Sequence, residues 1–379
     1  AMCTSRFDGS AEYLVCATGS SKVKIWNLQN VKNVSCVLSF MPHQSEMLYT
    51  VSCSACGKLF ISAEDKTVSV WNVNPKEKAV GTAYAASFRG HSAPVKGVSQ
   101  HPANSGLFMT NSDDGTARIY SLPLAEVSKA PPGHVASVSA VVFCQMGSKE
   151  YIASADGLGN LKLFESDCIT EIWNTKLLSK SPGMAAITSL AYCLGDVQSE
   201  DAYLAVGMHS TVHVVCVADG TLRSTFHDFP DWINSIEYFR GQIIAGGDNN
   251  CLQMLSVDDN GTLSSPREFD TSLVENANKY TSILCVSVGS EVCLSGANDN
   301  FVRVWNAATL TQMAAIELQN WVVCVKIKCG LDDRPGASNL GLAGVKGGFI
   351  HMIDCSLKGN FSILTKISAG GMGTTVAWC

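Results

Sequence analysis

Residues 301–305 read FVRVW, a short apolar run that ends on Trp305, and the same pattern returns along the whole chain. Two apolar residues flank a spacer, and a tryptophan or another large apolar residue follows. The anchors of the eight copies are Trp26, Trp71, Tyr120, Phe164, Val215, Leu255, Trp305 and Ile353, spaced by 45, 49, 44, 51, 40, 50 and 48 residues. A period of this length predicts one supersecondary unit repeated and packed side by side.

The unit that ends near Tyr120 shows how each copy is built. Its three runs are APVKGVSQHP (residues 93–102), GLFMTNSDDG (residues 106–115) and TARIYSLP (residues 116–123). The first two alternate and are divided by turn residues, and Asp-Asp-Gly predicts a tight hairpin into the third. Almost no segment has the 3.6-residue period of an amphipathic helix. The sequence therefore predicts an all-β protein with antiparallel neighbouring strands.

This unit resembles the WD40 repeat. Gly90-His91 and Gly133-His134 match the Gly-His pair of that family, and tryptophan followed by asparagine at 26, 71 and 305 stands where the family has Trp-Asp. Asp65, Asp114 and Asp299 each precede their anchor by six residues, as the hairpin aspartate of the family does. The resemblance covers residues 1–379 as one domain and implies a β-propeller with four antiparallel strands in each blade.

Eight anchors predict eight blades, with seven as the alternative if one weak unit is an insertion. The last residues, TTVAWC (374–379), look like the first strand of a blade, and AEYLVCATGSSKVKIWN (11–27) looks like its second and third strands. We therefore expect the C-terminal strand to pair with the N-terminal strands, which closes the ring and leaves no open sheet edge.

The resemblance also implies a structural role for the polar residues that match these motifs. In the family, a histidine, a hydroxyl residue, the aspartate and the tryptophan of a blade form a buried hydrogen-bond chain. Buried ionisable groups are costly unless they are paired, so these His/Asp pairs are expected to stabilise blades and not to catalyse a reaction. The expected members are His91, Asp114 and Tyr120; His43, Ser62, Asp65 and Trp71; and Asp299 with Trp305.

Composition and charge narrow the classes of function. Hydrophobic residues make up 46% and charged residues 16%, the net charge is −6, and the isoelectric point is about 5.8. These values favour a large folded core and give no general basic surface for nucleic acid. The sequence shows no long apolar stretch and no secretory signal, so we expect no membrane insertion. We interpret the 16 cysteines as reduced thiols of a cytoplasmic protein, with the nucleus as the alternative.

No motif predicts catalysis, a metal or a cofactor. Cys53-Ser-Ala-Cys56 is a lone CxxC without the second ligand pair that a structural zinc site needs. The glycine-rich stretch at 370–375 lacks the lysine of a phosphate-binding loop. We therefore expect no catalytic residue, no cofactor and no small-molecule ligand. An enzyme with its active site at the mouth of the channel is the less favoured alternative.

The residues just before the first strand of each blade should surround the central channel on the narrow top face. By register they are Met47, Pro94, Ser137, Ala186, Trp232, Ser282, Trp321 and Met372. Exposed aromatic and methionine side chains are typical anchors for protein partners, so Trp321, Met372, Met47 and Trp232 are the predicted binding residues. The expected function is a non-catalytic scaffold that binds peptide or helical segments of other proteins. The alternative is a substrate-recognition subunit of a ubiquitin ligase or of another multi-protein complex.

Overall fold

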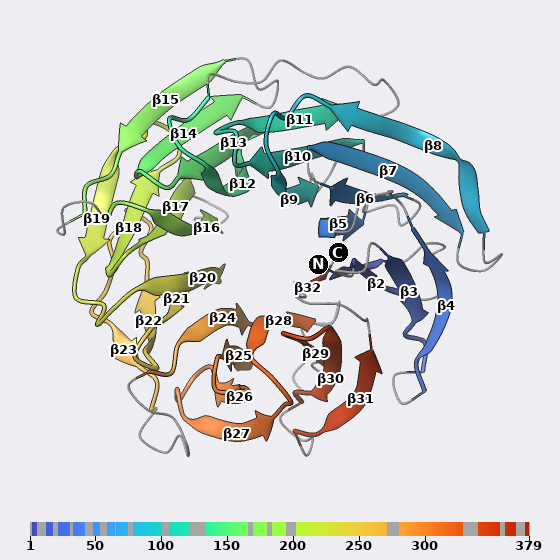
Figure 1. Ribbon diagram of the computed structural model, residues 1–379. Coiled ribbons are helices and arrows are strands. Elements are labelled where there is room, and N and C mark those ends of the chain that lie inside the picture. Colours follow the sequence, from blue (N-terminus) through green and yellow to red (C-terminus); the bar gives the residue numbers. More distant parts are fainter. Residues whose placement is uncertain are drawn as a thin grey trace.

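The computed structural model describes the chain except for residues 1, 6–12, 18–21, 31–32, 42–47, 54–58, 65, 75–78, 101–105, 122–132, 166–169, 180–183, 195–201, 271–279, 329–339, 357–360, 369–375 and 379. All regular secondary structure in the described part is β-strand. The strands form separate sheets arranged as a ring around a central channel (Figure 1). No helix in the described part is long and apolar enough to cross a bilayer. The prediction of an all-β propeller is confirmed.

The hydrogen-bonded strands form eight sheets, numbered here in chain order. Sheet 1 contains β32 (Val376–Trp378), β1 (Met2–Ser5), β2 (Tyr13–Ala17), β3 (Val23–Asn27) and β4 (Ser35–Phe40). Sheet 2 contains β5 (Leu48–Cys53), β6 (Leu59–Glu64), β7 (Thr67–Asn74) and β8 (Ala79–Arg89). Sheet 3 contains β9 (Val95–Gln100), β10 (Leu107–Ser112) and β11 (Ala117–Ser121).

Sheet 4 contains β12 (Val138–Met146), β13 (Lys149–Asp156), β14 (Asn160–Glu165) and β15 (Glu171–Lys176). Sheet 5 contains β16 (Ile187–Leu194), β17 (Ala202–Met208), β18 (Thr211–Cys216) and β19 (Leu222–Phe226). Sheet 6 contains β20 (Ile233–Phe239), β21 (Gln242–Gly247), β22 (Leu252–Ser256) and β23 (Arg267–Glu268).

Sheet 7 contains β24 (Ile283–Val288), β25 (Val292–Ala297), β26 (Phe301–Asn306) and β27 (Gln312–Glu317). Sheet 8 contains β28 (Val322–Lys328), β29 (Leu340–Val345), β30 (Phe349–Asp354) and β31 (Ile363–Ser368). The first strand of every sheet faces the channel, and β4, β8, β15, β19, β27 and β31 lie at the periphery (Figure 1). First strands of successive sheets contact one another around the ring, with β32 between β28 and β1.

The anchors of the repeat form the core. Each lies on the third strand of a different sheet, and none is more than 8% exposed. They pack between neighbouring sheets together with apolar residues of the second and first strands. At the junction of sheets 8 and 1, for example, Leu14 and Trp26 belong to one cluster with Leu342, Ile350 and Met352. A fully buried side chain of this size stabilises the fold by about 1.5–3 kcal/mol, so sheet-to-sheet packing holds the ring together.

A shared irregularity shows that the sheets are equivalent units. Near the start of the first strand, the pairing with the second strand slips by one residue, which is a β-bulge. The slips occur at Leu48/Thr50, Val95/Gly97, Val138/Ala140, Ile187/Ser189, Ile233/Ser235, Ile283/Cys285 and Val322/Cys324. The same bulge at the same place in seven sheets means that these first strands enter the channel wall with one geometry.

Ring closure differs in detail from the expectation. The C-terminal strand β32 does pair with the N-terminal strand β1, but it pairs in parallel, with Met2 opposite Val376 and Thr4 opposite Trp378. The first-strand position next to β2 is taken by β1, which pairs with β2 in antiparallel fashion. Only seven residues separate β1 from β2 in the sequence, so β1 reaches this position at a small cost in chain entropy.

The expectation of eight uniform, four-stranded antiparallel blades is therefore wrong in this respect. Six sheets have four antiparallel strands, sheet 1 has five strands with one parallel pair, and sheet 3 has three strands among the described residues. The fifth strand of sheet 1 arises because β1 occupies the position next to β2 and β32 then pairs with β1.

Candidate functional site

One end of the ring gathers two kinds of loop from every sheet. Consecutive strands are antiparallel, so the loop that leads into a first strand and the hairpin between the second and third strands lie at the same end. We call this end the top face. At five sheets, the residue before the first strand accepts a backbone hydrogen bond from the N–H at the start of that hairpin. The acceptor carbonyls belong to Pro94, Ser137, Trp232, Ser282 and Trp321, and the donors to Asp113, Gly157, Asp248, Asn298 and Lys346, at 2.8–3.2 Å.

These five acceptors are residues that the repeat register assigns to one equivalent position. Of the other members of that predicted set, Ala186 is half-buried, and Met47 and Met372 lie outside the described residues. The repeat register thus identifies residues that share one backbone position. Local packing then decides how far each of their side chains is exposed.

Trp321 is the most clearly exposed aromatic side chain of this predicted set. Its side chain is 44% exposed, and the ammonium of Lys346 lies 4.3 Å from the centre of its ring. The backbone on either side is fixed, because the Trp321 N–H donates to Asn320 Oδ1 at 2.8 Å and its carbonyl accepts from Lys346. A rigid aromatic ring of this kind loses little conformational entropy when a partner covers it.

Trp232, in the same register position on sheet 6, is only half-buried and leans on a neighbouring loop. Its ring meets that of His209, from the hairpin of sheet 5, edge to face with centroids 4.8 Å apart. The Trp232 N–H donates to Asp231 Oδ1 at 2.9 Å. Packing against an adjacent loop therefore takes up part of this side chain.

Tyr280 is a top-face residue that the register did not single out. It lies two residues before Ser282 and is 74% exposed, while its carbonyl accepts a hydrogen bond from Asn298 Nδ2 at 3.3 Å. An aromatic residue three positions ahead of the expected first strand was the signal that could have identified it.

Exposed apolar side chains are unevenly distributed over the described residues. Ten large hydrophobic residues are exposed there. Seven lie on the top face, in hairpins or in loops that lead into first strands: Met41, Val135, Leu158, Leu178, Met184, Tyr280 and Trp321. The other three lie on fourth strands at the periphery: Ile172, Leu222 and Ile363. The peripheral residues are scattered around the rim, whereas the top-face residues share one surface.

The hairpins of the top face are also hydrogen-bonded to the loops that connect one sheet to the next. The carbonyls of Gly115 and Gly159 accept hydrogen bonds from the loops after their own sheets, at 2.7 and 2.9 Å. Both glycines have a positive φ, and a Cβ on Gly115 would lie 2.7 Å from the carbonyl oxygen of His134. Only glycine fits this close approach without strain. The top face is thus a connected, preorganised surface.

Below this surface, His91 and Asp114 form a buried polar network in sheet 3. His91 Nδ1 lies 2.8 Å from Asp114 Oδ2, and His91 Nε2 lies 2.7 Å from Thr110 Oγ1. Burial tends to raise the pKa of Asp114, but hydrogen bonds from Thr116, Ser92 and His91 outweigh it and lower the pKa from 3.8 to about 2. Burial lowers the pKa of His91, against the opposing effect of Asp114. The network therefore joins a carboxylate to a neutral imidazole and holds the hairpin to the first strand.

Tyr120, the third expected member, lies in the core beside this network. It is fully buried, and its ring stacks on Phe108 with centroids 5.2 Å apart. Burial raises the pKa of its hydroxyl. The chain of polar groups thus runs from Asp114 through His91 and Thr110.

Sheet 4 contains an equivalent network that the sequence reasoning missed. His134 Nδ1 lies 3.1 Å from Asp156 Oδ2, and His134 Nε2 lies 2.7 Å from Ser154 Oγ. Asp156 precedes the anchor Phe164 by eight residues and not by six, because it is the last residue of the second strand β13, whereas Asp114 lies in the hairpin after β10. The Gly-His pair at 133–134 was the available signal.

Sheet 7 uses a different partner for its aspartate. Asp299 forms an ion pair with Arg303, whose Nη1 donates to Asp299 Oδ1 at 3.2 Å and which is 1% exposed. Trp305 is fully buried, and its indole N–H donates to Ser295 Oγ at 2.9 Å. The expected pair Asp299 and Trp305 therefore belongs to two separate hydrogen-bonded groups.

The second expected network, in sheet 2, is only partly described. Trp71 is buried and its ring lies 5.6 Å from that of Phe40. His43, Asp65 and the side chain of Ser62 lie outside the described residues, as do Cys56 and the side chain of Cys53.

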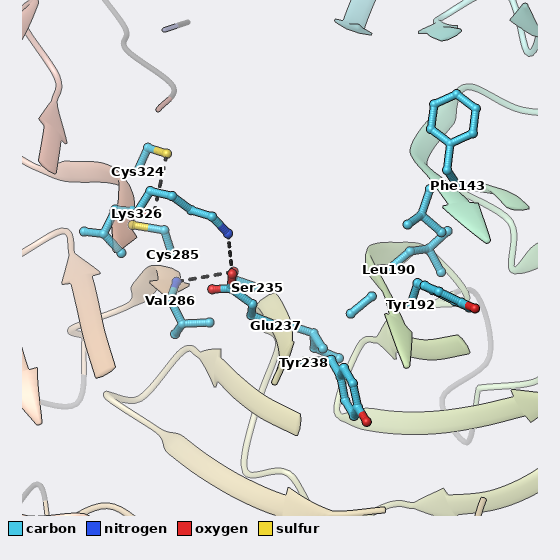
Figure 2. Close-up of a pocket in the computed structure, with 14 residues that line it drawn as sticks. Phe143, Leu190, Tyr192, Ser235, Glu237, Tyr238, Cys285, Val286, Cys324 and Lys326 are labelled. Atoms are coloured by element: carbon cyan, nitrogen blue, oxygen red, sulfur yellow. Dashed lines mark hydrogen bonds and ion pairs between the residues drawn. The ribbon is translucent and has the colours of Figure 1, made fainter. Parts of the chain in front are cut away.

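The wall of the channel contains a cavity of about 500 Å³ lined by first-strand residues of sheets 4 to 8 (Figure 2). Glu237 on β20 forms an ion pair with Lys326 on β28, and its other oxygen accepts from the Val288 N–H at 3.0 Å. These contacts tie three successive sheets together. Among the described residues, no group of three or more His, Cys, Asp or Glu side chains could hold a metal ion.

Comparison with known proteins agrees with this architecture. The family profile "WD domain, G-beta repeat" matches residues 34–72 and 83–121. Each match starts in or just before the fourth strand of one sheet and runs through the first three strands of the next. The guanine nucleotide-binding protein subunit beta of Zea mays is 24% identical over 139 residues, which are 36% of this chain and 36% of that protein.

Solved structures are similar over most of the chain. Sqt1 of Saccharomyces cerevisiae has a TM-score of 0.70 at 10% identity, and the computationally designed Ika8 protein has 0.67 at 15%. Each covers 90% of this chain and 92% of its own. U3-55K has a TM-score of 0.57 at 17% identity, covering 76% of this chain and 86% of its own. At such identities the likeness concerns the fold, and together with the repeat matches it leads to one conclusion. The chain belongs to the WD40-repeat β-propeller family.

Proposed function

We propose that this protein is a non-catalytic scaffold that binds segments of other proteins on its top face. The observation that carries the proposal is the concentration of exposed apolar side chains there, above all Tyr280 and Trp321, on loops held by backbone hydrogen bonds. Aromatic residues on a rigid surface are typical energetic anchors of protein interfaces. The family supports this proposal, because WD40 propellers are typically scaffolds.

The proposed partners are proteins, and the proposed binding residues are Trp321, Tyr280 and Trp232, joined by Met47 and Met372 of the original register. The last two lie outside the described residues and stay predictions from the repeat register. A cytoplasmic location suits this role, and it is supported by the free thiols of the described cysteines.

Quantitative affinity capture with three purified forms tests the proposal. The forms are the wild type, a Tyr280→Ala/Trp321→Ala variant, and a Leu222→Ala/Ile363→Ala variant that removes exposed apolar side chains at the periphery. Loss of one or two anchors of this kind weakens binding by about 2 kcal/mol or more, roughly thirtyfold. We expect a set of proteins that the top-face variant loses and the peripheral variant keeps. Equal capture by all three folded forms would refute the proposal.

A further inference from the structure

The top face of sheets 6, 7 and 8 carries three aromatic side chains in succession: Trp232, Tyr280 and Trp321. We call these three residues the aromatic patch. Backbone hydrogen bonds connect the loops that present them. The Asn250 N–H of sheet 6 donates to the Thr281 carbonyl at 2.6 Å, and the Leu318 N–H donates to the Asn300 carbonyl of sheet 7 at 2.7 Å. The three rings therefore stand on one continuous framework.

The described charges around this patch are mostly negative. Asp228 and Asp231 lie in the loop that leads to Trp232, and Asp248 begins the hairpin beside it. On the same three sheets, the top-face carboxylate of Asp299 is matched by Arg303. The described lysines here are Lys346, in the hairpin of sheet 8, and Lys366, which donates to Gln319 Oε1 in the loop before Trp321. The surface next to the aromatic patch thus has an excess of carboxylates, in line with the net charge of −6 for the chain.

The aromatic patch already accommodates a cation from within the chain. The ammonium of Lys346 lies 4.3 Å from the ring centre of Trp321, which is cation–π geometry. Trp232 presents the same residue type at the equivalent position, but its loop contributes carboxylates and no lysine. A ring flanked by carboxylates is well suited to a cationic side chain from a partner.

We propose that the occupant of the aromatic patch is a basic segment of another protein, in which lysine or arginine side chains flank an apolar residue. The apolar residue covers Tyr280 and Trp321, and the cationic side chains face the carboxylates around Trp232. This inference rests on the proposed function, and it adds the chemistry of the partner. Complementary charges of this kind act mainly on specificity and on the rate of association.

Selection from a random library of displayed twelve-residue peptides tests the inference without a known partner. Enriched peptides are synthesised, and their affinities are measured by fluorescence anisotropy at low and physiological salt. We expect the enriched set to carry net positive charge and an apolar residue, and to bind more weakly as salt increases.

Charge-reversal variants give the matched comparison. Asp228→Lys changes an exposed carboxylate beside Trp232, and Asp259→Lys changes an exposed carboxylate after the third strand of sheet 6, at the opposite end. At low salt we expect Asp228→Lys to weaken the basic peptides by about three- to tenfold, and Asp259→Lys to leave them within about twofold.

The outcomes separate the two proposals. Enriched peptides that are neutral or acidic but lose binding in Tyr280→Ala/Trp321→Ala would overturn the basic partner and keep the top face as a binding surface. Basic peptides that bind both the aromatic and the Asp228→Lys variants normally would place the site elsewhere and overturn both. Absence of any enriched peptide that depends on the aromatic patch counts against both as well.

Discussion

Replacing His351 with leucine should make this protein less sensitive to acid. His351 on β30 is 3% exposed, and neither ring nitrogen has a hydrogen-bond partner among the described residues. Burial, followed by the charge of Lys366 on the neighbouring strand, lowers the pKa of His351 from 6.5 to about 4. Between these two values the unfolded chain binds a proton that the folded protein does not bind. The free energy of unfolding therefore falls as the pH falls from about 6.5 to about 4.

The size of the effect follows from the two pKa values. At pH 5 the unfolded histidine is almost fully protonated and the folded one is mostly neutral, which corresponds to about 2 kcal/mol lost relative to pH 8. His351→Leu removes this loss and also removes two buried nitrogens without partners, so stability at pH 8 should change little. Urea unfolding of both forms at pH 8 and pH 5, followed by tryptophan fluorescence, measures the difference.

The matched control is Met352→Leu on the same strand, which removes no titrating group and should keep the pH dependence of the wild type. Buried His213 also titrates with a lowered pKa of about 4, but it is present in every form and cancels in the comparison. If His351→Leu loses as much stability between pH 8 and pH 5 as the wild type does, the reasoning about burial is wrong.

Two further predictions concern buried charge and thiol reactivity. Asp299→Asn leaves the buried Arg303 without its carboxylate, so it should lower the free energy of unfolding by about 3 kcal/mol, measured as a lower Tm. The control Asp113→Asn removes an exposed carboxylate and should lower it by less than about 1 kcal/mol. Equal losses in the two variants would contradict this reasoning. Burial raises the pKa of the Cys285 thiol, so iodoacetamide should modify this cysteine only after unfolding. The exposed Cys36 should react in the native protein, and peptide mapping distinguishes the two sites. Rapid labelling of Cys285 in the native protein would contradict this reasoning.

The repeat period predicted the fold because each anchor has the same physical task. Trp26, Tyr120 and Trp305 differ in size and polarity, yet all lie on third strands and fill the space between sheets. Closure through β32 was predicted from the same repeat, but the strand Met2–Ser5 was not. Its four residues, MCTS, show no alternation, and they form a strand by pairing with β2 on one side and β32 on the other.

The buried networks were harder to predict because the carboxylate does not keep one place in the repeat. Counting six residues back from an anchor identifies Asp114, which lies in a hairpin, but in sheet 4 it reaches Leu158. The carboxylate that bonds to His134 is Asp156, the last residue of the second strand. In sheet 7 the aspartate pairs with an arginine of the third strand, where the family pattern has a histidine. The pattern predicts the type of residue, but not its exact position or its bonding partner.

The top face combines a fixed backbone with variable side chains, so the residues proposed for binding can be substituted without loss of the fold. Trp232 and Trp321 make the same carbonyl-to-hairpin hydrogen bond as Ser137 does in sheet 4. That bond uses only main-chain atoms, so any side chain can occupy the position. Whether the side chain is exposed depends on the hairpins around it: His209, from the hairpin of sheet 5, shields Trp232, and Lys346, from the hairpin of sheet 8, covers one face of Trp321. Substitutions at these rings should therefore alter binding far more than they alter the free energy of unfolding.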